Sequence, residues 1–108
     1  MIDYLLIESR DPFESREVDN NYTLAANLSA SGHNTTLFLV QNGVFPARDS
    51  GSHNGLKELL KKGVKVVCDD FSLTERGIKS DAITGGIDTD SLEFVIQCLA
   101  NKYKTIWL

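Results

Sequence analysis

The sequence predicts a three-layer α/β/α sandwich, an α/β fold in which helices cover both faces of a five-stranded, mainly parallel sheet. Five short segments along the 108 residues are apolar on consecutive positions and largely β-branched. This pattern is typical of strands that are buried on both faces. Helical patterns separate the segments, and such alternation implies parallel strands joined by right-handed crossovers. The predicted strands are residues 4–8, 35–40, 64–68, 82–87 and 104–108.

The segments between the strands carry apolar residues at helical spacing. Gly32 and Gly63 follow the first two helices, where glycine is the favoured residue after a helix end. Ser72 and Glu75 form the pattern of a capping box, which predicts that the third helix begins at Ser72. The predicted helices are residues 15–31, 55–63 and 72–78, and a fourth that begins at Asp88 or Asp90.

Length and composition indicate one globular domain that spans residues 1–108. The chain is 42% apolar and 24% charged, and a domain of this size buries roughly two-thirds of its unfolded surface. The net charge is −4, and positive charge is not concentrated in a stripe along the chain. The charge therefore disfavours nucleic acid as a direct partner.

The two cysteines and the N-terminal sequence predict a cytoplasmic protein with reduced thiols. The chain opens with "MIDYLLIESRD", which lacks the pattern of a secretory signal, and two cysteines do not suggest a disulfide framework. The longest apolar runs fall far short of the ~20 residues of a membrane helix, so we expect no membrane association.

A ligand site in such a sheet lies beyond the carboxyl ends of the strands. Three loops are expected to meet there, namely "QNGVFPARDSGSHNG" (41–55), "CDDFS" (68–72) and "TGGIDTDS" (84–91). The chain has no phosphate-binding glycine signature, and His33 and His53 lack metal-ligand spacing. We therefore expect neither a metal nor an organic cofactor, while His53, in the longest loop, is a candidate pocket residue.

Cys68 is the candidate nucleophile because it ends a predicted strand at the expected site, immediately before a helix. A helix N-terminus lowers the pKa of a thiol, by an interaction of about 0.3–1 kcal/mol. Asp69 and Asp70 follow directly, and a nearby carboxylate opposes thiolate formation by roughly 0.7–3 kcal/mol. Cys68 is thus expected to be mostly a thiol at neutral pH, and both a reactive and a packing role stay open. Cys98 lies among apolar residues of the fourth helix and is expected to be structural.

Three stretches resemble the sulfur-relay proteins of the DsrE/DsrF/DsrH type, which include the Tus proteins of tRNA thiolation. They are "LFLVQNGVFPAR" (37–48), "GVKVVCDDFSLTERGI" (63–78) and "KTIWL" (104–108), and the first and last are most similar to the DsrH branch. The resemblance implies a cytoplasmic α/β sandwich that forms homo-oligomers or hetero-oligomers with related subunits. It also implies that sulfur passes as a persulfide on a cysteine after the third strand, between donor and acceptor proteins.

The resemblance also allows a test of register. The family's carrier position corresponds to the residue six after Gly63 and eight before Gly77, and both counts give Asp69. Cys68 lies one residue earlier, and successive side chains of an extended segment point to opposite faces. The pocket residues that we expect from the loops and the resemblance are Asn42, Gly43, Val44, His53, Asp69 and Asp70.

Two functions follow as hypotheses. The chain is either a sulfur-relay protein in sulfur trafficking, as a sulfurtransferase-like carrier on Cys68 or a non-catalytic subunit, or an oligomeric binding and assembly module with a small-ligand pocket and no transfer chemistry. Asp69 at the carrier position favours the second, and Cys68 at the strand end favours the first. Phe13 and Phe45, in loop-like segments, are candidates for a subunit interface.

Overall fold

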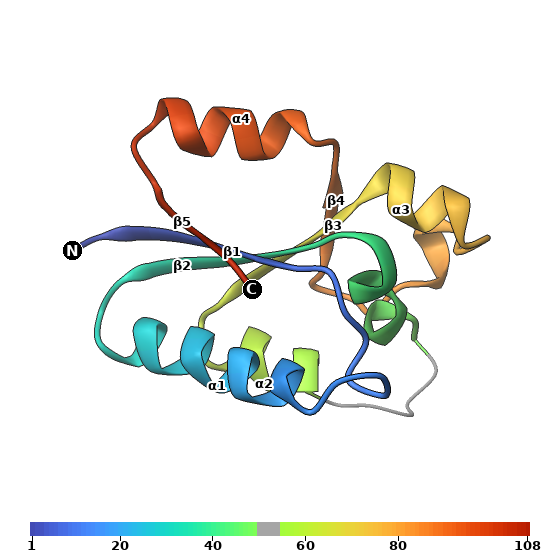
Figure 1. The fold of residues 1–108 in the computed structure, drawn as a ribbon, viewed down its shortest axis with the longest axis horizontal. Coiled ribbons are helices and arrows are strands. Elements are labelled where there is room, and N and C mark those ends of the chain that lie inside the picture. The colour runs from blue at the N-terminus through green and yellow to red at the C-terminus, as the bar shows by residue number, and fades with distance from the viewer. Residues whose placement is uncertain (50–54) are drawn as a thin grey trace.

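The computed structural model describes residues 1–49 and 55–108 and has the predicted α/β/α fold (Figure 1). The described residues form one five-stranded sheet in the order β4-β3-β2-β1-β5, and every neighbouring pair of strands is parallel. The strands are β1 (Asp3–Glu8), β2 (Asn34–Leu39), β3 (Lys65–Asp69), β4 (Asp88–Asp90) and β5 (Lys104–Trp107). The helices are α1 (Glu17–Ala30), α2 (Gly55–Lys61), α3 (Asp70–Glu75) and α4 (Glu93–Ala100).

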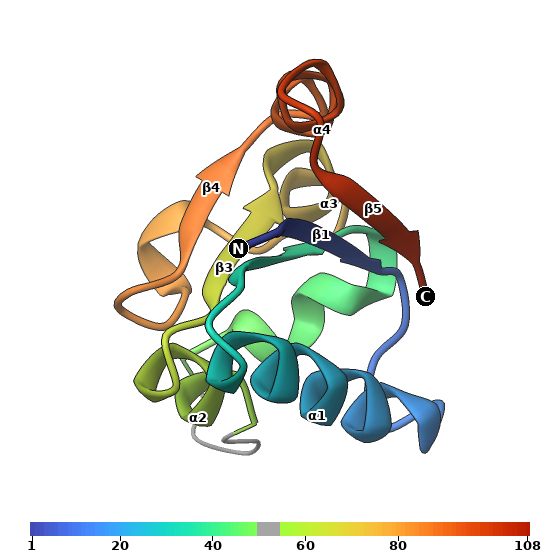
Figure 2. The same cartoon turned by 90° about the vertical axis from the view of Figure 1, so that its left-hand side faces the viewer.

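The strand order explains how the helices are divided between the two faces. From β1 to β4 each strand is added on the same side of its predecessor, whereas the chain then returns to place β5 on the far side of β1. Right-handed crossovers that run in opposite directions put their helices on opposite faces. Accordingly α1 and α2 cover one face and α4 covers the other, while α3 lies beyond the end of β3 (Figures 1 and 2).

Alternation along the strands separates the core into two clusters. The cluster under α1 and α2 takes Leu37, Leu39, Val66 and Cys68 from β2 and β3, together with Val18, Tyr22 and Leu59 from the helices. The cluster under α4 takes Leu5, Ile7, Phe38 and Val67 from the sheet, together with Val95 and Cys98. Each central strand thus buries both of its faces, which is why it is apolar on consecutive positions.

The prediction for the fourth strand was wrong. Residues 82–87 do not form a strand, although Ile83 makes an isolated antiparallel bridge to Arg48. Gly86 adopts a φ of +95°, which turns the chain away from an extended path. The strand is instead Asp88–Asp90, a polar segment that was expected to begin the fourth helix, and α4 begins only at Glu93. A short, charged strand is common at the edge of a sheet, where nothing selects for apolar residues.

The third helix begins earlier than the capping-box pattern predicts. Asp69 is its N-cap residue, and the Asp69 side chain accepts a hydrogen bond from the Ser72 backbone N–H at 3.0 Å. Ser72 lies inside the first turn, so the strand passes directly into the helix without a loop. Asp69 caps the helix in place of Ser72, because the Asp69 carboxylate reaches the free N–H groups of the first turn as soon as the strand ends.

Part of the long irregular segment is ordered as a 3-10 helix, Gln41–Ala47. It follows β2 and packs against β3 and α3, so it lies at the carboxyl ends of the central strands. Among the described residues, no helix combines the length and apolar character that crossing a membrane would need.

Candidate functional site

A cavity of about 450 Å³ lies at the carboxyl ends of the strands, where the sequence places a ligand site. Its walls come from the ends of β1, β3 and β5, from the segment after β2, and from α3 and α4. The lining residues are Ile7, Val40, Gln41, Asp69, Phe71, Ser72, Glu75, Arg76, Leu92, Val95 and Trp107. We call this cavity the carboxyl-edge pocket.

Cys68 and Asp69 lie on opposite faces of the sheet. Cys68 is fully buried in the cluster under α1 and α2, next to Leu39 in the register of β2 and β3. Asp69 follows Val67 onto the face covered by α4 and lines the carboxyl-edge pocket. Because side chains alternate along β3, only one of two successive residues can face this pocket. The residue that does so is the aspartate.

The surroundings of Cys68 stabilise its neutral thiol. Burial raises the pKa of Cys68 to about 12, and the negative charge of Asp69 adds to this effect. Cys68 is therefore overwhelmingly a thiol at neutral pH, whereas the thiolate is the form that attacks sulfur. Cys98 is also buried, and burial raises its pKa as well.

Asp69 is held by a short chain of hydrogen bonds. Ser72 Oγ donates to Asp69 Oδ2 at 2.7 Å, and the Ser72 N–H donates to the same oxygen at 3.0 Å. Ser72 Oγ in turn accepts from the Gln41 N–H at 2.8 Å. Gln41 has a φ of +52°, in the left-handed region that a non-glycine residue adopts infrequently. These bonds tie the segment after β2 to the start of α3 and fix the carboxylate at the pocket.

The other oxygen of this carboxylate has no such support. Asp69 is only 3% exposed, and within residues 1–49 and 55–108 no group forms a hydrogen bond to its Oδ1. Buried polar atoms in native proteins nearly always have a partner. A group that enters the carboxyl-edge pocket could supply one.

The other predicted pocket residues lie elsewhere. Asn42 is half-buried, and its Oδ1 accepts from Arg76 Nε at 3.1 Å. Gly43 and Val44 are buried in the 3-10 helix, and none of these three residues lines the carboxyl-edge pocket. Asp70 is exposed and lines a separate depression beside α3. His53 lies outside the described residues.

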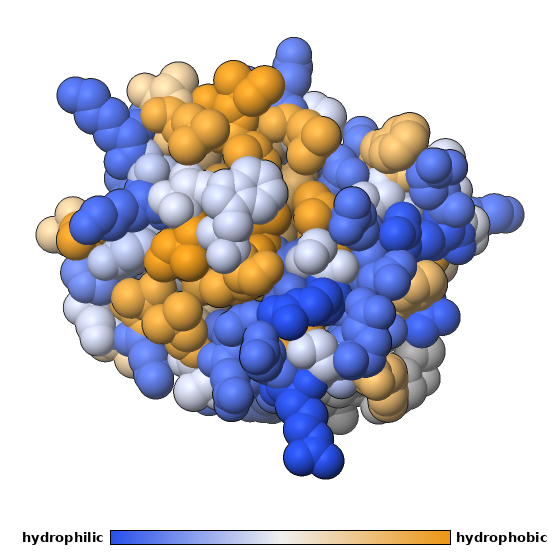
Figure 3. Space-filling view, in the orientation of Figure 1, coloured by the Kyte–Doolittle hydropathy of each residue, from blue (hydrophilic) through white to orange (hydrophobic). Residues whose placement is uncertain are grey.

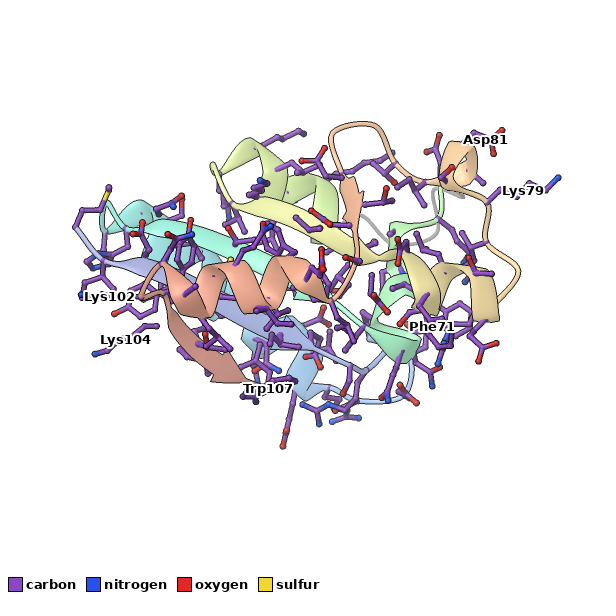
Figure 4. All side chains as sticks on the ribbon, turned by 90° about the horizontal axis from the view of Figure 1, so that it is seen from above. Phe71, Lys79, Asp81, Lys102, Lys104 and Trp107 are labelled. Carbon is purple, nitrogen blue, oxygen red and sulfur yellow. The ribbon has the colours of Figure 1, made fainter. Side chains whose placement is uncertain are left out.

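Much of the pocket wall was not predicted from the sequence. Phe71, Leu92 and Trp107 line the pocket although they are 66%, 56% and 72% exposed. Figure 4 shows Phe71 on α3 and Trp107 at the end of β5, two segments that are far apart in the sequence. Their positions next to the ends of predicted strands and helices were the signal that the sequence offered, but only the fold brings them together.

A larger depression, of about 650 Å³, lies at the outer edge of β4. Its carboxylates, Asp81, Asp88 and Asp90, are all exposed, so no desolvated carboxylate marks it as a site. Across the part of the chain that the structure describes, no three histidine, cysteine or acidic side chains gather as metal ligands. Neither the depression at β4 nor the search for metal ligands indicates a second functional site among the described residues.

Three solved structures are similar to this one over nearly their whole length. A protein of unknown function, MTH1491, from Methanobacterium thermoautotrophicum is 21% identical, with a TM-score of 0.81 over 98% of this chain and 100% of that one. The ychN protein from E.coli is 20% identical, with a TM-score of 0.82 over 100% of both chains. BT1422, a conserved protein of unknown function from Bacteroides thetaiotaomicron, is 19% identical, with a TM-score of 0.80 over 98% and 94%. At these identities the likeness concerns the fold alone.

The sequence itself gives a more specific result. None of the curated proteins matches the chain. The model of the DsrE/DsrF-like family, however, matches residues 3–108, which include β1 and β5 as well as the whole carboxyl-edge pocket. The chain therefore belongs to the DsrE/DsrF-like family.

Proposed function

We propose that this chain is a binding and assembly member of the DsrE/DsrF-like family, with a small-ligand pocket and without persulfide transfer. Its fold is that of the sulfur-relay type, and its site is the carboxyl-edge pocket. The observation that carries the proposal is the placement of Asp69 at this pocket while Cys68 lies in the apolar core. Sulfur trafficking through a partner subunit is compatible with this role, since the chain would then act without carrying sulfur itself.

Transfer of a persulfide requires a thiolate that can reach the sulfur donor. Cys68 is fully buried, so a sulfur donor cannot reach it, and burial raises its pKa to about 12, so it is not a thiolate. Neither requirement is met at neutral pH. The carboxylate of Asp69 cannot replace the thiol, because an oxygen nucleophile does not carry persulfide sulfur. The carboxyl-edge pocket has apolar walls and a carboxylate, and neither cysteine is among its lining residues, which supports binding rather than transfer.

We expect the folded protein to take up no sulfur on Cys68 at pH 8. The test is to incubate it with glutathione persulfide, block the thiols with iodoacetamide, and locate any adduct of about 32 Da, the mass of one sulfur atom, by peptide mass spectrometry. The same treatment in urea is the control, because unfolding exposes Cys68 and should permit the modification. Rapid formation of the adduct on Cys68 of the folded protein would show that the chain is a sulfur carrier.

We further propose that the chain forms a homo-oligomer through α4 and β5. Ile96 and Leu99 of α4 are 64% and 55% exposed and do not line the carboxyl-edge pocket. Figure 3 shows apolar surface continuing over this side of the molecule, and β5 is an unpaired edge of the sheet. A contiguous apolar patch beside an open strand edge is typical of a protein interface.

The two phenylalanines expected at an interface are placed differently. Phe13 is 76% exposed, in the segment between β1 and α1. Phe45 is half-buried, with the guanidinium groups of Arg48 and Arg76 at 5.0 and 5.7 Å from its ring centre. The α4 and β5 surface is therefore the stronger candidate. Partner proteins and the cytoplasmic location stay predictions from the sequence.

Replacing Ile96 with glutamate should dissociate the assembly, because each copy would bury a charge in an apolar contact. We expect light scattering after gel filtration to give the 12.0 kDa monomer for Ile96→Glu and at least twice this mass for the wild type. Gln97→Glu adds the same charge at the neighbouring exposed position and should leave the mass unchanged. A wild-type protein that elutes as a monomer at micromolar concentration would contradict self-assembly.

A further inference from the structure

We propose that the carboxyl-edge pocket binds a small primary amine, whose ammonium group pairs with Asp69 and whose apolar body lies against Trp107 and Leu92. This inference rests on the proposed function and names the class of ligand that the site takes. It follows from the free oxygen of a buried carboxylate, from the charges of the pocket and from its apolar walls.

The buried carboxylate sets the chemistry of the ligand group that meets it. Asp69 Oδ2 already accepts two hydrogen bonds from Ser72, whereas no described group donates to Oδ1. A carboxylate oxygen can only accept, so its partner must carry N–H or O–H. Hydrogen bonds between charged groups are the strongest of this kind, and an ammonium group both donates and neutralises the buried charge.

The remaining charges of the pocket favour a cation over an anion. Glu75 adds a second carboxylate to the lining, and Arg76 is the one cation among the lining residues. The Arg76 guanidinium is already engaged, because Nε donates to Asn42 Oδ1 at 3.1 Å and Nη1 donates to the Ser72 carbonyl at 3.3 Å. An anionic ligand would therefore meet two carboxylates and a cation that is committed elsewhere.

The walls select an apolar body for the same ligand. Ile7 and Val95 are buried, and Phe71, Leu92 and Trp107 form an exposed rim. A ligand that covers the rim removes these side chains from water, and the face of an indole ring also attracts a cation. The volume of about 450 Å³ lies within the range of small-molecule sites. A phenyl or short branched alkyl group next to an ammonium group matches this combination.

Trp107 is the only tryptophan of the chain, so its fluorescence reports directly on this pocket. We would titrate the protein with three probes of similar size, 2-phenylethylamine, 2-phenylethanol and 3-phenylpropanoate. We expect the amine to bind at least about 10-fold more tightly than the alcohol and the acid, because it alone forms a charge-assisted hydrogen bond to Asp69.

The variant Asp69→Asn tests the contact itself. The asparagine oxygen can still cap α3, but its amide group presents a donor or a neutral acceptor to the pocket, so we expect the preference for the amine to disappear. The control Asp81→Asn removes the same charge at an exposed position outside the pocket and should keep the preference. Circular dichroism of Asp69→Asn establishes that it is folded. The comparison of the three probes on the wild type tests the preference for the amine without relying on this variant.

The outcomes separate this inference from the proposed function. Equal or tighter binding of the alcohol or the acid would overturn the proposal that the ligand is an amine, but the carboxyl-edge pocket would still be a ligand site. A wild type whose fluorescence responds to none of the probes would overturn the proposal that the pocket binds a primary amine. A persulfide on Cys68 of the folded protein would instead refute the proposed function, whatever the probes show.

Discussion

Replacing Gly43 with alanine is expected to destabilise the protein by about 3 kcal/mol, because the new methyl group has no space. A Cβ atom at this position would clash with the Glu8 carbonyl oxygen and lie 3.1 Å from the Glu8 carbonyl carbon. These are backbone atoms, and the same oxygen accepts a hydrogen bond from the Val40 N–H at 3.0 Å. Relief would therefore require the 3-10 helix to move away from the end of β1, with loss of its packing.

Urea unfolding followed by far-UV circular dichroism measures this loss of stability. Gly85→Ala is the matched control, because nothing lies within 4 Å of a Cβ atom built at Gly85. That variant should be within about 0.5 kcal/mol of the wild type or slightly more stable. A Gly43→Ala variant as stable as the control would show that the segment can shift freely, and that Gly43 does not hold it against β1.

Replacing Glu8 with alanine should cost about 3–5 kcal/mol, because three part-buried donors lose their acceptor and each such loss costs about 1–3 kcal/mol. Glu8 ends β1, and its side chain is fully buried. Its Oε2 accepts from the backbone N–H groups of Ser9 at 2.9 Å and Arg10 at 3.1 Å, and its Oε1 accepts from Asn21 Nδ2 at 2.8 Å. Alanine would leave these donors without the carboxylate that joins the end of β1 to α1.

The matched control is Glu17→Ala. Both carboxylates pair with the Arg10 guanidinium, and its Nε lies 3.5 Å from Glu8 Oε2. Glu17 Oε2 lies 3.2 Å from Arg10 Nη1, but the Glu17 side chain is 73% exposed. An exposed pair contributes little, so we expect a loss below about 1 kcal/mol in the same urea experiment. If Glu8→Ala proves no more costly than Glu17→Ala, water must replace the lost acceptor at the end of β1.

Much of the fold could be predicted from the sequence because the central strands are buried on both faces. Residues 4–8, 35–40 and 64–68 were predicted as strands, and β1, β2 and β3 lie there within about one residue, a normal margin for element ends. The first helix was predicted to stop before Gly32, and α1 ends at Ala30 with Gly32 at a φ of +88°. Local hydrophobic pattern and turn chemistry are sufficient for such elements.

The edge of the sheet could not be predicted in this way. β4 is the polar segment Asp88–Asp90, all exposed, and its strand conformation depends on pairing with β3 rather than on its own residues. The apolar segment before it was the better strand by composition. Its apolar residues Ile83 and Ile87 pack against the core from an irregular path instead.

The sequence by itself determined the α/β/α architecture through its local hydrophobic pattern, and the family through the three stretches that resemble it. The carboxyl edge as the place of the site was an expectation from the fold class. The glycine register of the sequence also pointed to Asp69. Only the tertiary structure decided which of Cys68 and Asp69 faces the pocket, since that choice depends on how β3 sits between α2 and α4. The pocket itself was likewise a tertiary result, because the crossover that places β5 beside β1 brings Trp107 to the far wall from Asp69.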